Sequence, residues 1–241
     1  MIKRLKMAFF ILAILFGAFL FAYGGYDDSP GAQGLGVLLT VGGIIGVIRI
    51  NKKMMINIKM LNIVNNEDEI VAQASRDDIH RDGFLHREIH VYFITPNRQI
   101  IFQHRAKNKE TYPDLLDATV GGHVEIGDSY LDTAIKEAAE ETGLQIDSQE
   151  LIFINKTTNK SIDQSTGKIN NAIRTSYLFI FDGDIGDLKI ESGQALGFEL
   201  WSLDELADIS DTDSQRFIPY ILDFSRKELI KSFDQYVSKN N

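Results

Sequence analysis

The sequence predicts an α/β fold in which a mixed sheet is covered by helices on both faces, with two membrane-spanning helices in front of it. Two long apolar segments lie near the N-terminus, strand-like runs flank one amphipathic helix in the middle, and a helical pattern ends the chain. The 241 residues are 44% apolar and 24% charged, which is ordinary for a folded protein. The absence of Cys excludes a disulfide framework, a thiolate zinc site and a cysteine nucleophile.

The N-terminal segments 7–23 and 32–48 contain no charged residue, and each approaches the roughly 17 to 25 residues that cross a bilayer. Basic residues flank the pair at both outer ends, namely Lys3, Arg4, Lys6, Arg49, Lys52 and Lys53. The positive-inside rule then predicts that both ends, and the domain that follows, face the cytoplasm. We therefore expect a transmembrane hairpin over 1–53, a linker over 54–69 and a folded domain over 70–241. A cleaved signal peptide is the alternative, although no convincing A-x-A cleavage site is present.

Small residues recur four apart in both apolar segments, as Ala13 with Gly17 and Gly42 with Gly46. Such pairs let helices approach closely, so the sequence indicates either tight packing within the hairpin or a homodimer. Segment 54–66 is mixed in composition and fits a linker, an interfacial helix or a first strand.

Charge is distributed unevenly along the chain. Residues 1–56 hold six Lys or Arg and two Asp, a net charge of +4. Because the whole chain has a net charge of −9, the other 185 residues have a net charge of −9 − 4 = −13. A domain this acidic is not a nucleic-acid binder by its overall electrostatics.

The strands are predicted from β-branched and aromatic runs. Residues 89–95 and 99–103, joined by Pro96-Asn97-Arg98, form a hairpin, and a polar loop over 156–171 separates two later strands. The other expected elements are strands at 151–155, 174–181 and 198–201, a helix capped by Ser202 with Glu205, and one or two helices from 214 onward.

One helix carries the chemistry. Ser129 with Asp132 is typical of an N-cap, and Gly143 lies where a left-handed C-cap belongs. The carboxylates of Glu137, Glu140 and Glu141 stand at positions i, i+3 and i+4, so they share one face. Like charges this close favour a hard divalent cation such as Mg²⁺ or Mn²⁺, the kind of ion that diphosphate chemistry uses.

The segment around this helix resembles the Nudix hydrolase box, G-x5-E-x7-R-E-U-x-E-E-x-G-U with U aliphatic. The matching residues are Gly122, Glu137, Ala138, Glu140, Glu141, Gly143 and Leu144. Asp128 replaces a Glu and Lys136 replaces the Arg, and both substitutions keep the charge. The resemblance implies an α/β/α sandwich with a mixed sheet, in agreement with the element order, and hydrolysis of a small-molecule diphosphate.

The resemblance also implies roles for individual residues. Glu137, Glu140, Glu141 and the Gly122 carbonyl would hold Mg²⁺ or Mn²⁺, and Lys136 would orient the carboxylates. Glu140 or Glu141 would also act as the base. Glu191 and Glu199 are the loop alternatives for that role.

A second resemblance is to the isopentenyl-diphosphate-isomerase-like branch of this family. It rests on His86-Arg87, on the run 103–109, on Tyr112-Pro113, on Asp117 and on Gly121-Gly122-His123. It implies that Arg105 and Lys109 contact the diphosphate, with His104 lining the same pocket, and that His80, His86 and His123 bind a second metal. Gly121 stands where the isomerases carry a catalytic Cys, and the two Glu of their metal site have no counterpart near 170–172.

The sequence thus predicts a membrane-anchored, cytoplasm-facing, metal-dependent Nudix hydrolase acting on a nucleoside-diphosphate-type or other organic pyrophosphate. Two alternatives remain. One is an isomerase-like enzyme acting on isoprenoid diphosphates, and the other is a non-catalytic, pyrophosphate-binding regulatory module.

Overall fold

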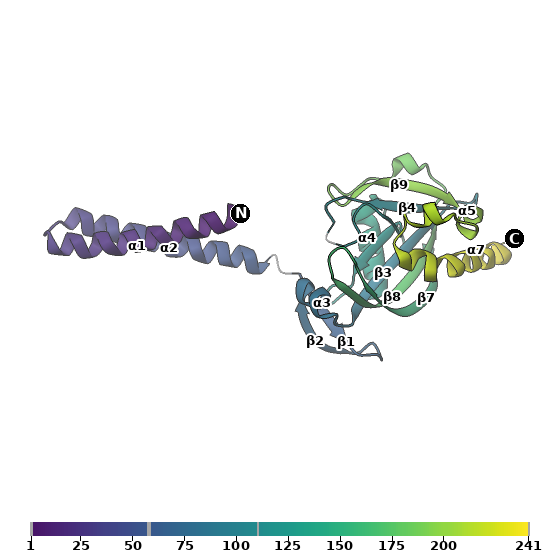
Figure 1. Cartoon of the computed structure of the whole chain (residues 1–241), viewed down its shortest axis with the longest axis horizontal. Coiled ribbons are helices and arrows are strands. Elements are labelled where there is room, and N and C mark those ends of the chain that lie inside the picture. The colour runs from purple at the N-terminus through teal and green to yellow at the C-terminus, as the bar shows by residue number, and fades with distance from the viewer. Residues whose placement is uncertain (1, 57–58, 110, 241) are drawn as a thin grey trace. The chain divides into compact units, whose positions relative to one another are not determined.

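The computed structural model describes residues 2–56, 59–109 and 111–240. The chain divides into two compact units, residues 1–59 and 60–241. Figure 1 labels the helices and strands of both units.

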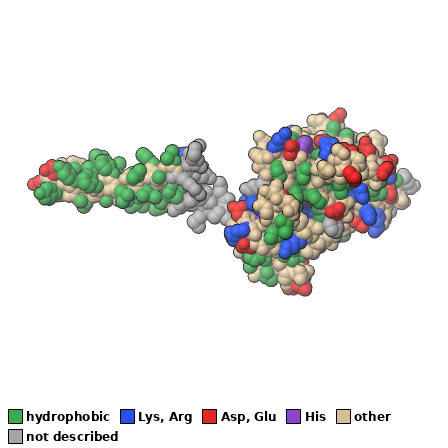
Figure 2. Space-filling view, in the orientation of Figure 1, with side chains coloured by type: hydrophobic (Ala, Val, Ile, Leu, Met, Phe, Trp, Pro, Cys, Tyr) green, Lys and Arg blue, Asp and Glu red, His purple; other side chains and the backbone are tan. Residues whose placement is uncertain are grey.

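The N-terminal unit is a pair of long helices, α1 (Ile2–Tyr26) and α2 (Pro30–Ile56). Within them Leu5–Tyr26 and Pro30–Ile50 are long and apolar enough to cross a membrane, with mean hydropathies of 2.4 and 1.8. Only 6% and 17% of these segments are buried, and Figure 2 shows hydrophobic side chains over the surface of the pair. The two apolar helices that the sequence predicts are therefore present.

Glycines allow the close contact between α1 and α2. A Cβ added at Gly17 would lie 2.7 Å from the Gly36 carbonyl oxygen, and one at Gly46 would lie 2.3 Å from the Phe10 ring. Gly42, by contrast, has no atom within 4 Å of an added Cβ. Of the predicted small residues, Gly17 and Gly46 thus lie in the helix contact and Gly42 does not.

The second unit begins with an antiparallel pair, β1 (Met60–Val64) and β2 (Ile70–Ser75), followed by the short helix α3 (Arg76–Asp82). Segment 54–69, expected to be a linker, therefore contains the end of α2 and the strand β1. Residues 60–64 pair antiparallel with β2, and a first strand is one of the three alternatives that the composition of segment 54–66 leaves open.

The main sheet is mixed and, among the described residues, has seven strands built around β3 (His86–Ile94). β3 pairs antiparallel with β4 (Gln99–Arg105) and β6 (Val120–His123), and parallel with β8 (Ile169–Ile180). The remaining strands are β5 (Leu116–Asp117), β7 (Ile152–Ile162) and β9 (Ala195–Ser202). The predicted α/β class with a mixed sheet is confirmed.

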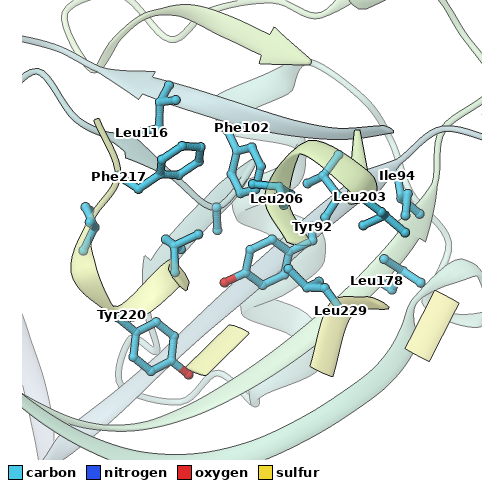
Figure 3. Packing of buried hydrophobic residues seen from close by; sticks show 14 of the residues in the cluster. Tyr92, Ile94, Phe102, Leu116, Leu178, Leu203, Leu206, Phe217, Tyr220 and Leu229 are labelled. Atoms are coloured by element: carbon cyan, nitrogen blue, oxygen red, sulfur yellow. The ribbon is translucent and has the colours of Figure 1, made fainter. Parts of the chain in front are cut away.

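Both faces of this sheet are buried under helices. Tyr92 and Ile94 join the cluster drawn in Figure 3, which includes Leu229 of the C-terminal helix α7 (Arg226–Asn240). Ile89, Val91 and Phe93 alternate into a second cluster, with Ala134 and Ala138 of α4 (Tyr130–Thr142). Successive side chains of β3 therefore point alternately into the two clusters, as they do in a sheet that lies between two helical layers.

Local signals fix both ends of α4. The Ser129 hydroxyl accepts from the Asp132 backbone N–H at 3.1 Å, and the Asp132 carboxylate accepts from Ser129 N–H in return. Gly143 ends the helix in the left-handed region, with φ of 75°. Both predicted caps are confirmed.

The polar loop predicted over 156–171 is wrong. β7 continues to Ile162 and pairs with β8 as a long antiparallel hairpin, so only the residues between Ile162 and Ile169 form the turn. Exposed and half-buried side chains alternate along β7, as expected for a sheet edge facing solvent. Polar residues at a half-exposed edge conceal a strand from a search for apolar runs.

The turns between the last elements are short helices. α5 (Leu203–Ala207) follows β9 with Ser202 as its cap, in agreement with the predicted capping box. α6 (Asp211–Ser214) and a π-helical turn (Ile221–Ser225) lead into α7. Two single turns of 3-10 helix also occur, at Ser148–Glu150 and Ile185–Asp187.

Candidate active site

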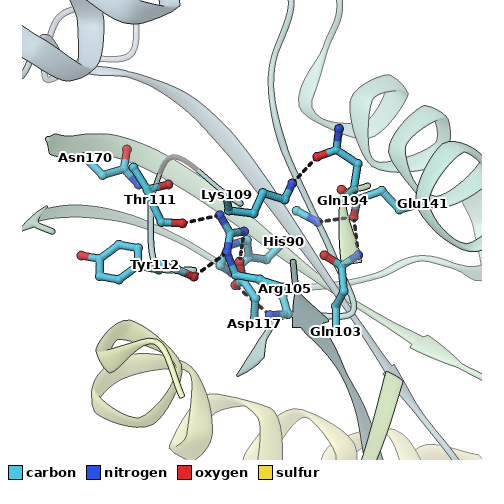
Figure 4. A network of polar contacts seen from close by, with 12 residues as sticks. His90, Gln103, Arg105, Lys109, Thr111, Tyr112, Asp117, Glu141, Asn170 and Gln194 are labelled. Atoms are coloured by element: carbon cyan, nitrogen blue, oxygen red, sulfur yellow. Dashed lines mark hydrogen bonds and ion pairs between the residues drawn. The ribbon is translucent and has the colours of Figure 1, made fainter. Parts of the chain in front are cut away.

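The acidic face of α4 meets the backbone of β6 at Glu141. This side chain is 7% exposed, and its carboxylate accepts hydrogen bonds from the Gln103 amide and the Gly121 backbone N–H, both at 3.2 Å. Figure 4 shows Gln103 and Glu141 side by side in this network. Burial, together with the negative charge of Glu137, raises the Glu141 pKa to about 8. The carboxyl group therefore holds a proton at neutral pH, and a bound cation would replace that proton.

Glu137 lies against Gly122. A Cβ added at Gly122 would be 2.6 Å from the Glu137 carboxylate carbon, so glycine is needed for the carboxylate to reach the β6 backbone. Glu140 is exposed on the solvent side of α4. The structure thus brings two of the three predicted carboxylates, Glu137 and Glu141, to the Gly121-Gly122 backbone.

This arrangement fits a hard divalent cation. Two carboxylates converge beside a backbone segment whose carbonyl groups are oxygen donors, and oxygen donors are what Mg²⁺ and Mn²⁺ prefer. The mutual repulsion that raises the Glu141 pKa is relieved when a cation lies between the two side chains.

Lys136 contacts the loop before α4. Its Nζ donates to Glu125 at 2.7 Å and lies 3.8 Å from Asp128. It therefore ties the loop before α4 to the helix. Asp128, which replaces the Glu of the family box, is part of this brace.

A polar cavity of about 130 Å³ opens beside Glu141. It is bordered by strands β3 and β8, by Gly121, Gly122 and His123 of β6, and by the segment after β4. The volume corresponds to about four water molecules, which suits the polar head of a ligand whose remainder lies outside.

Arg105 and Lys109 both line the cavity, as predicted, but protein partners engage them. Arg105 Nη1 donates to Asp117 at 2.8 Å, and its Nε and Nη2 donate to the carbonyls of Tyr112 and Thr111 at 3.1 and 2.8 Å. Figure 4 shows this guanidinium among its three acceptors, with the Lys109 amine bonded to the Gln194 amide oxygen. Burial also lowers the Lys109 pKa.

Three residues that the sequence analysis linked to the site lie elsewhere. His104 Nε2 is 3.0 Å from Asp114, and its Nδ1 is 3.5 Å from Glu199. Glu199 also accepts from Arg216 at 2.6 Å, and Glu191 is exposed. Of the described residues that border the cavity, none is His104, Glu191 or Glu199.

The three predicted histidines, His80, His86 and His123, do come together. One ligand atom of each lies within 4.8 Å of the others, and every pair of rings has its centroids 5.1 Å apart. The Nε2 atoms of His80 and His123 are 2.9 Å apart. The Glu88 carboxylate completes the cluster, since its Oε1 lies 3.4 Å from His123 Nε2 and 3.5 Å from His86 Nε2.

Backbone carbonyls orient two of these rings. His80 Nδ1 lies 3.2 Å from the Ile169 oxygen and His86 Nδ1 lies 3.1 Å from the Phe84 oxygen, which turns both Nε2 atoms inward. His86 Nε2 is buried without a hydrogen-bond partner among the described residues. Burial lowers the pKa of both His80 and His123, so these imidazoles are neutral at physiological pH, which is the ligating form. The donor set fits a metal that accepts imidazole.

Several cavity residues had no role in the sequence-based prediction. His90 lines the cavity, and burial with the nearby Arg174 charge lowers its pKa to about 3. Glu88 and Arg174 also line it, and Arg174 Nη2 donates to Glu88 Oε2 at 2.7 Å. Arg174 had a signal in the sequence, because it is the single charged residue of β8 and a buried charge must find a partner, whereas Glu88 stands beside Arg87 in β3 and had none.

Comparison with known proteins assigns the family. A family model described as the NUDIX domain matches residues 84–221, more than half of the chain. The Nudix hydrolase YfcD of Escherichia coli K12 is 33% identical over 93 residues, covering 39% of this chain and 52% of that protein. A Nudix hydrolase of Clostridium acetobutylicum is 26% identical over 161 residues, covering 64% of this chain and 74% of that protein. The chain spans about half the length of the first of these relatives.

Solved structures with a similar chain trace include the protein DR0079 of Deinococcus radiodurans. It is 23% identical, with a TM-score of 0.48 over 65% of this chain and 96% of that one. The NUDIX domain of Shewanella oneidensis NrtR, complexed with ADP ribose, is 12% identical, with a TM-score of 0.45 over 68% of this chain and 99% of that one. On the strength of the match over residues 84–221, the chain belongs to the Nudix family.

Proposed function

We propose that this chain is a metal-dependent hydrolase of an organic pyrophosphate of the nucleoside-diphosphate type, held at a membrane by α1 and α2. The observation that carries the proposal is the meeting of Glu137 and Glu141 with the Gly121-Gly122 backbone at the wall of a polar cavity. Two converging carboxylates beside carbonyl donors, next to buried cationic side chains, suit a metal-bound diphosphate.

In this proposal Glu137, Glu140, Glu141 and the Gly122 carbonyl hold Mg²⁺ or Mn²⁺. The cation supplies neutralisation of the diphosphate charge and a water of lowered pKa. Glu140 or Glu141 accepts the proton of the attacking water, and each needs to be ionised for that role. We do not propose Glu191 or Glu199 as the base, because neither is among the described residues that border the cavity. Lys136 supports the loop at the start of α4 through Glu125.

The cavity residues Arg105 and Lys109 form the basic side of the diphosphate site. Arg105 is held rigid by its three acceptors, and a rigid guanidinium loses little conformational entropy when a substrate arrives. Lys109 can exchange its Gln194 partner for a phosphate oxygen, because a single neutral acceptor is a weaker partner than an anion.

The two N-terminal helices are proposed to form a membrane hairpin with the catalytic unit in the cytoplasm. The basic residues at both outer ends support this topology. A tag fused after residue 241 should be inaccessible from outside intact cells, and external labelling of that tag would overturn the topology.

Self-association through the hairpin is also proposed. The Gly42 face of α2 has no atom within 4 Å of an added Cβ, which leaves it open to a second copy of the helix. Crosslinking of the full chain in vesicles should give a dimer that a Gly42→Ile substitution removes. An unchanged dimer yield would contradict dimerisation through the Gly42 face of α2.

The test of the proposed activity uses the full chain in detergent with a panel of nucleoside diphosphates, nucleoside diphosphate sugars and prenyl diphosphates. Each is supplied with Mg²⁺ or Mn²⁺, and release of phosphate and monophosphate is measured. We expect turnover that requires the metal and is lost in Glu141→Gln. Absence of turnover across the panel would exclude the hydrolase and favour a non-catalytic pyrophosphate-binding module.

A second candidate function, an isomerase-like enzyme acting on isoprenoid diphosphates, is favoured by the histidine cluster with Glu88. We propose that His80, His86 and His123 bind a second metal there. Co²⁺ added to the full chain should give a visible absorption band that His123→Ala weakens. Gly121 argues against isomerase chemistry, since it offers no side chain where the isomerases carry Cys.

A further inference from the structure

We propose that Arg174 is a substrate-binding residue of the cavity, donating from its Nε and Nη1 to an oxygen of the substrate diphosphate. The inference rests on the proposed function for the identity of the ligand. It assigns the diphosphate a cationic partner other than Arg105 and Lys109.

Arg174 is buried with part of its hydrogen-bonding capacity unused. It belongs to β8, lines the cavity and is 5% exposed. Its Nη2 donates to Glu88 Oε2 at 2.7 Å, whereas its Nε and Nη1 have no hydrogen-bond partner among the described residues. The large majority of buried side-chain polar atoms in proteins find a partner, so two free donors on one buried guanidinium call for an acceptor that the protein itself does not supply.

The guanidinium is held in place by two neighbours. The Glu88 carboxylate fixes one end, and the Tyr220 ring lies 3.9 Å from the guanidinium carbon. Glu88 balances the charge of Arg174, which allows a cation to remain buried before any ligand binds. An arginine oriented in this way has its free donors preorganised for an anion.

The other buried cations of the cavity have fewer donors to spare. Each of the three nitrogens of Arg105 already donates to Asp117, Tyr112 or Thr111, and Lys109 donates to Gln194. Among the fully buried residues that border the cavity in the described chain, Arg174 is the one Lys or Arg, and two of its nitrogens are unengaged.

The guanidinium of Arg174 borders the same cavity as the proposed metal site. Glu88, its partner, lies on β3 opposite His123 of β6, and the neighbouring pair joins Ile89 to Gly122. Side chains alternate along β3, so Glu88 lies on the face of Tyr92 and not on the face that α4 covers, but Arg174 and Glu141 border the same cavity. A diphosphate held by the α4 carboxylates through a cation is within reach of Arg174.

The test measures binding without turnover. The probe is imidodiphosphate with Mn²⁺, in which nitrogen replaces the bridging oxygen, titrated into the full chain in detergent by calorimetry. Arg174→Lys keeps the charge beside Glu88 but loses the two free donors, so we expect affinity to fall by about tenfold to a hundredfold. Arg87→Lys is the matched control, because Arg87 is also paired, to Asp68 at 2.6 Å, and does not border the cavity among the described residues. It should change affinity less than twofold.

Equal affinity in wild type and Arg174→Lys, or no binding of the probe to wild type, would overturn the inference. If Arg174→Lys fails to fold, as judged by Trp201 fluorescence, the double variant Glu88→Gln with Arg174→Met removes both charges together and should show the same loss. Wild-type affinity in that double variant would also overturn it. If the variants lose probe binding and wild type shows no turnover across the diphosphate panel, the proposed hydrolase activity is refuted while the proposed binding role of Arg174 is supported.

Discussion

Replacing Glu141 with glutamine is expected to stabilise the metal-free chain while abolishing its metal-dependent activity. Glutamine has the shape of the protonated side chain, and its amide oxygen can accept both hydrogen bonds that Glu141 accepts from Gln103 and Gly121. The substitution therefore removes the buried charge and keeps the packing.

The size of the effect follows from the Glu141 pKa, which is raised from 4.5 to about 8 by burial and by Glu137. Below pH 4.5 the group is protonated in both the folded and unfolded chain, so it contributes no pH dependence there. Between pH 4.5 and about 8 only the folded chain keeps the proton. The free energy of unfolding then falls by about 1.4 kcal/mol per pH unit as pH rises. Between about pH 6 and pH 8 wild type loses about 3 kcal/mol relative to Glu141→Gln, and above the folded pKa the gap stays constant.

The assay is urea unfolding of the full chain in detergent with EDTA, followed by fluorescence of Trp201. This is the single tryptophan, and its ring packs 4.9 Å from Phe217 inside the second unit, so it reports on that unit. Glu140→Gln, an exposed neighbour on the same helix, serves as the control and should follow wild type at every pH. Parallel pH profiles for wild type and Glu141→Gln would refute the argument that Glu141 is buried and protonated.

Three further outcomes are expected. Apparent Mn²⁺ affinity, measured by electron paramagnetic resonance titration, should rise by up to about tenfold per pH unit until about pH 8, because the metal displaces a proton; a flat profile would contradict this. Gly122→Ala places a Cβ 2.6 Å from the Glu137 carboxylate carbon and should weaken Mn²⁺ binding by about tenfold or more, whereas Gly121→Ala makes only an ordinary 3.4 Å contact and should bind nearly as wild type. Gly46→Leu should destabilise the helix pair by about 1–3 kcal/mol in thermal circular dichroism, since its Cβ would clash at 2.3 Å, while Gly34→Leu, with open space, should not.

The parts of this fold that could be predicted are those with local causes. The caps of α4, Ser129 and Gly143, depend on residues within one helical turn, and both are present. The hairpin of β3 and β4 likewise follows from apolar strands on either side of a Pro-containing turn. The second part of strand β7, residues 156–162, has no such signal, because its pairing with β8 satisfies the backbone of a segment whose side chains are largely polar.

The contacts of the site depend on long-range packing. The pairing of Arg174 with Glu88 joins strands 86 residues apart, and the contact of Glu141 with Gln103 spans 38 residues. The role of Lys136 could not be read from the α4 pattern, since Glu125 lies in the loop before the helix and not on its acidic face. Sequence spacing identifies residues on one helix face, but only the tertiary fold decides which of them turn toward the sheet.

The central claim is that the α4 carboxylates, and not the histidine cluster, hold the metal that turnover requires. The most direct measurement compares initial rates of phosphate release in Mg²⁺ by the full chain, by Glu141→Gln and by His86→Gln, with the best substrate of the diphosphate panel. We expect a loss of at least about a hundredfold in Glu141→Gln, with most of the activity retained in His86→Gln. Full activity in Glu141→Gln together with loss in His86→Gln would contradict it and move the chemistry to the histidine cluster.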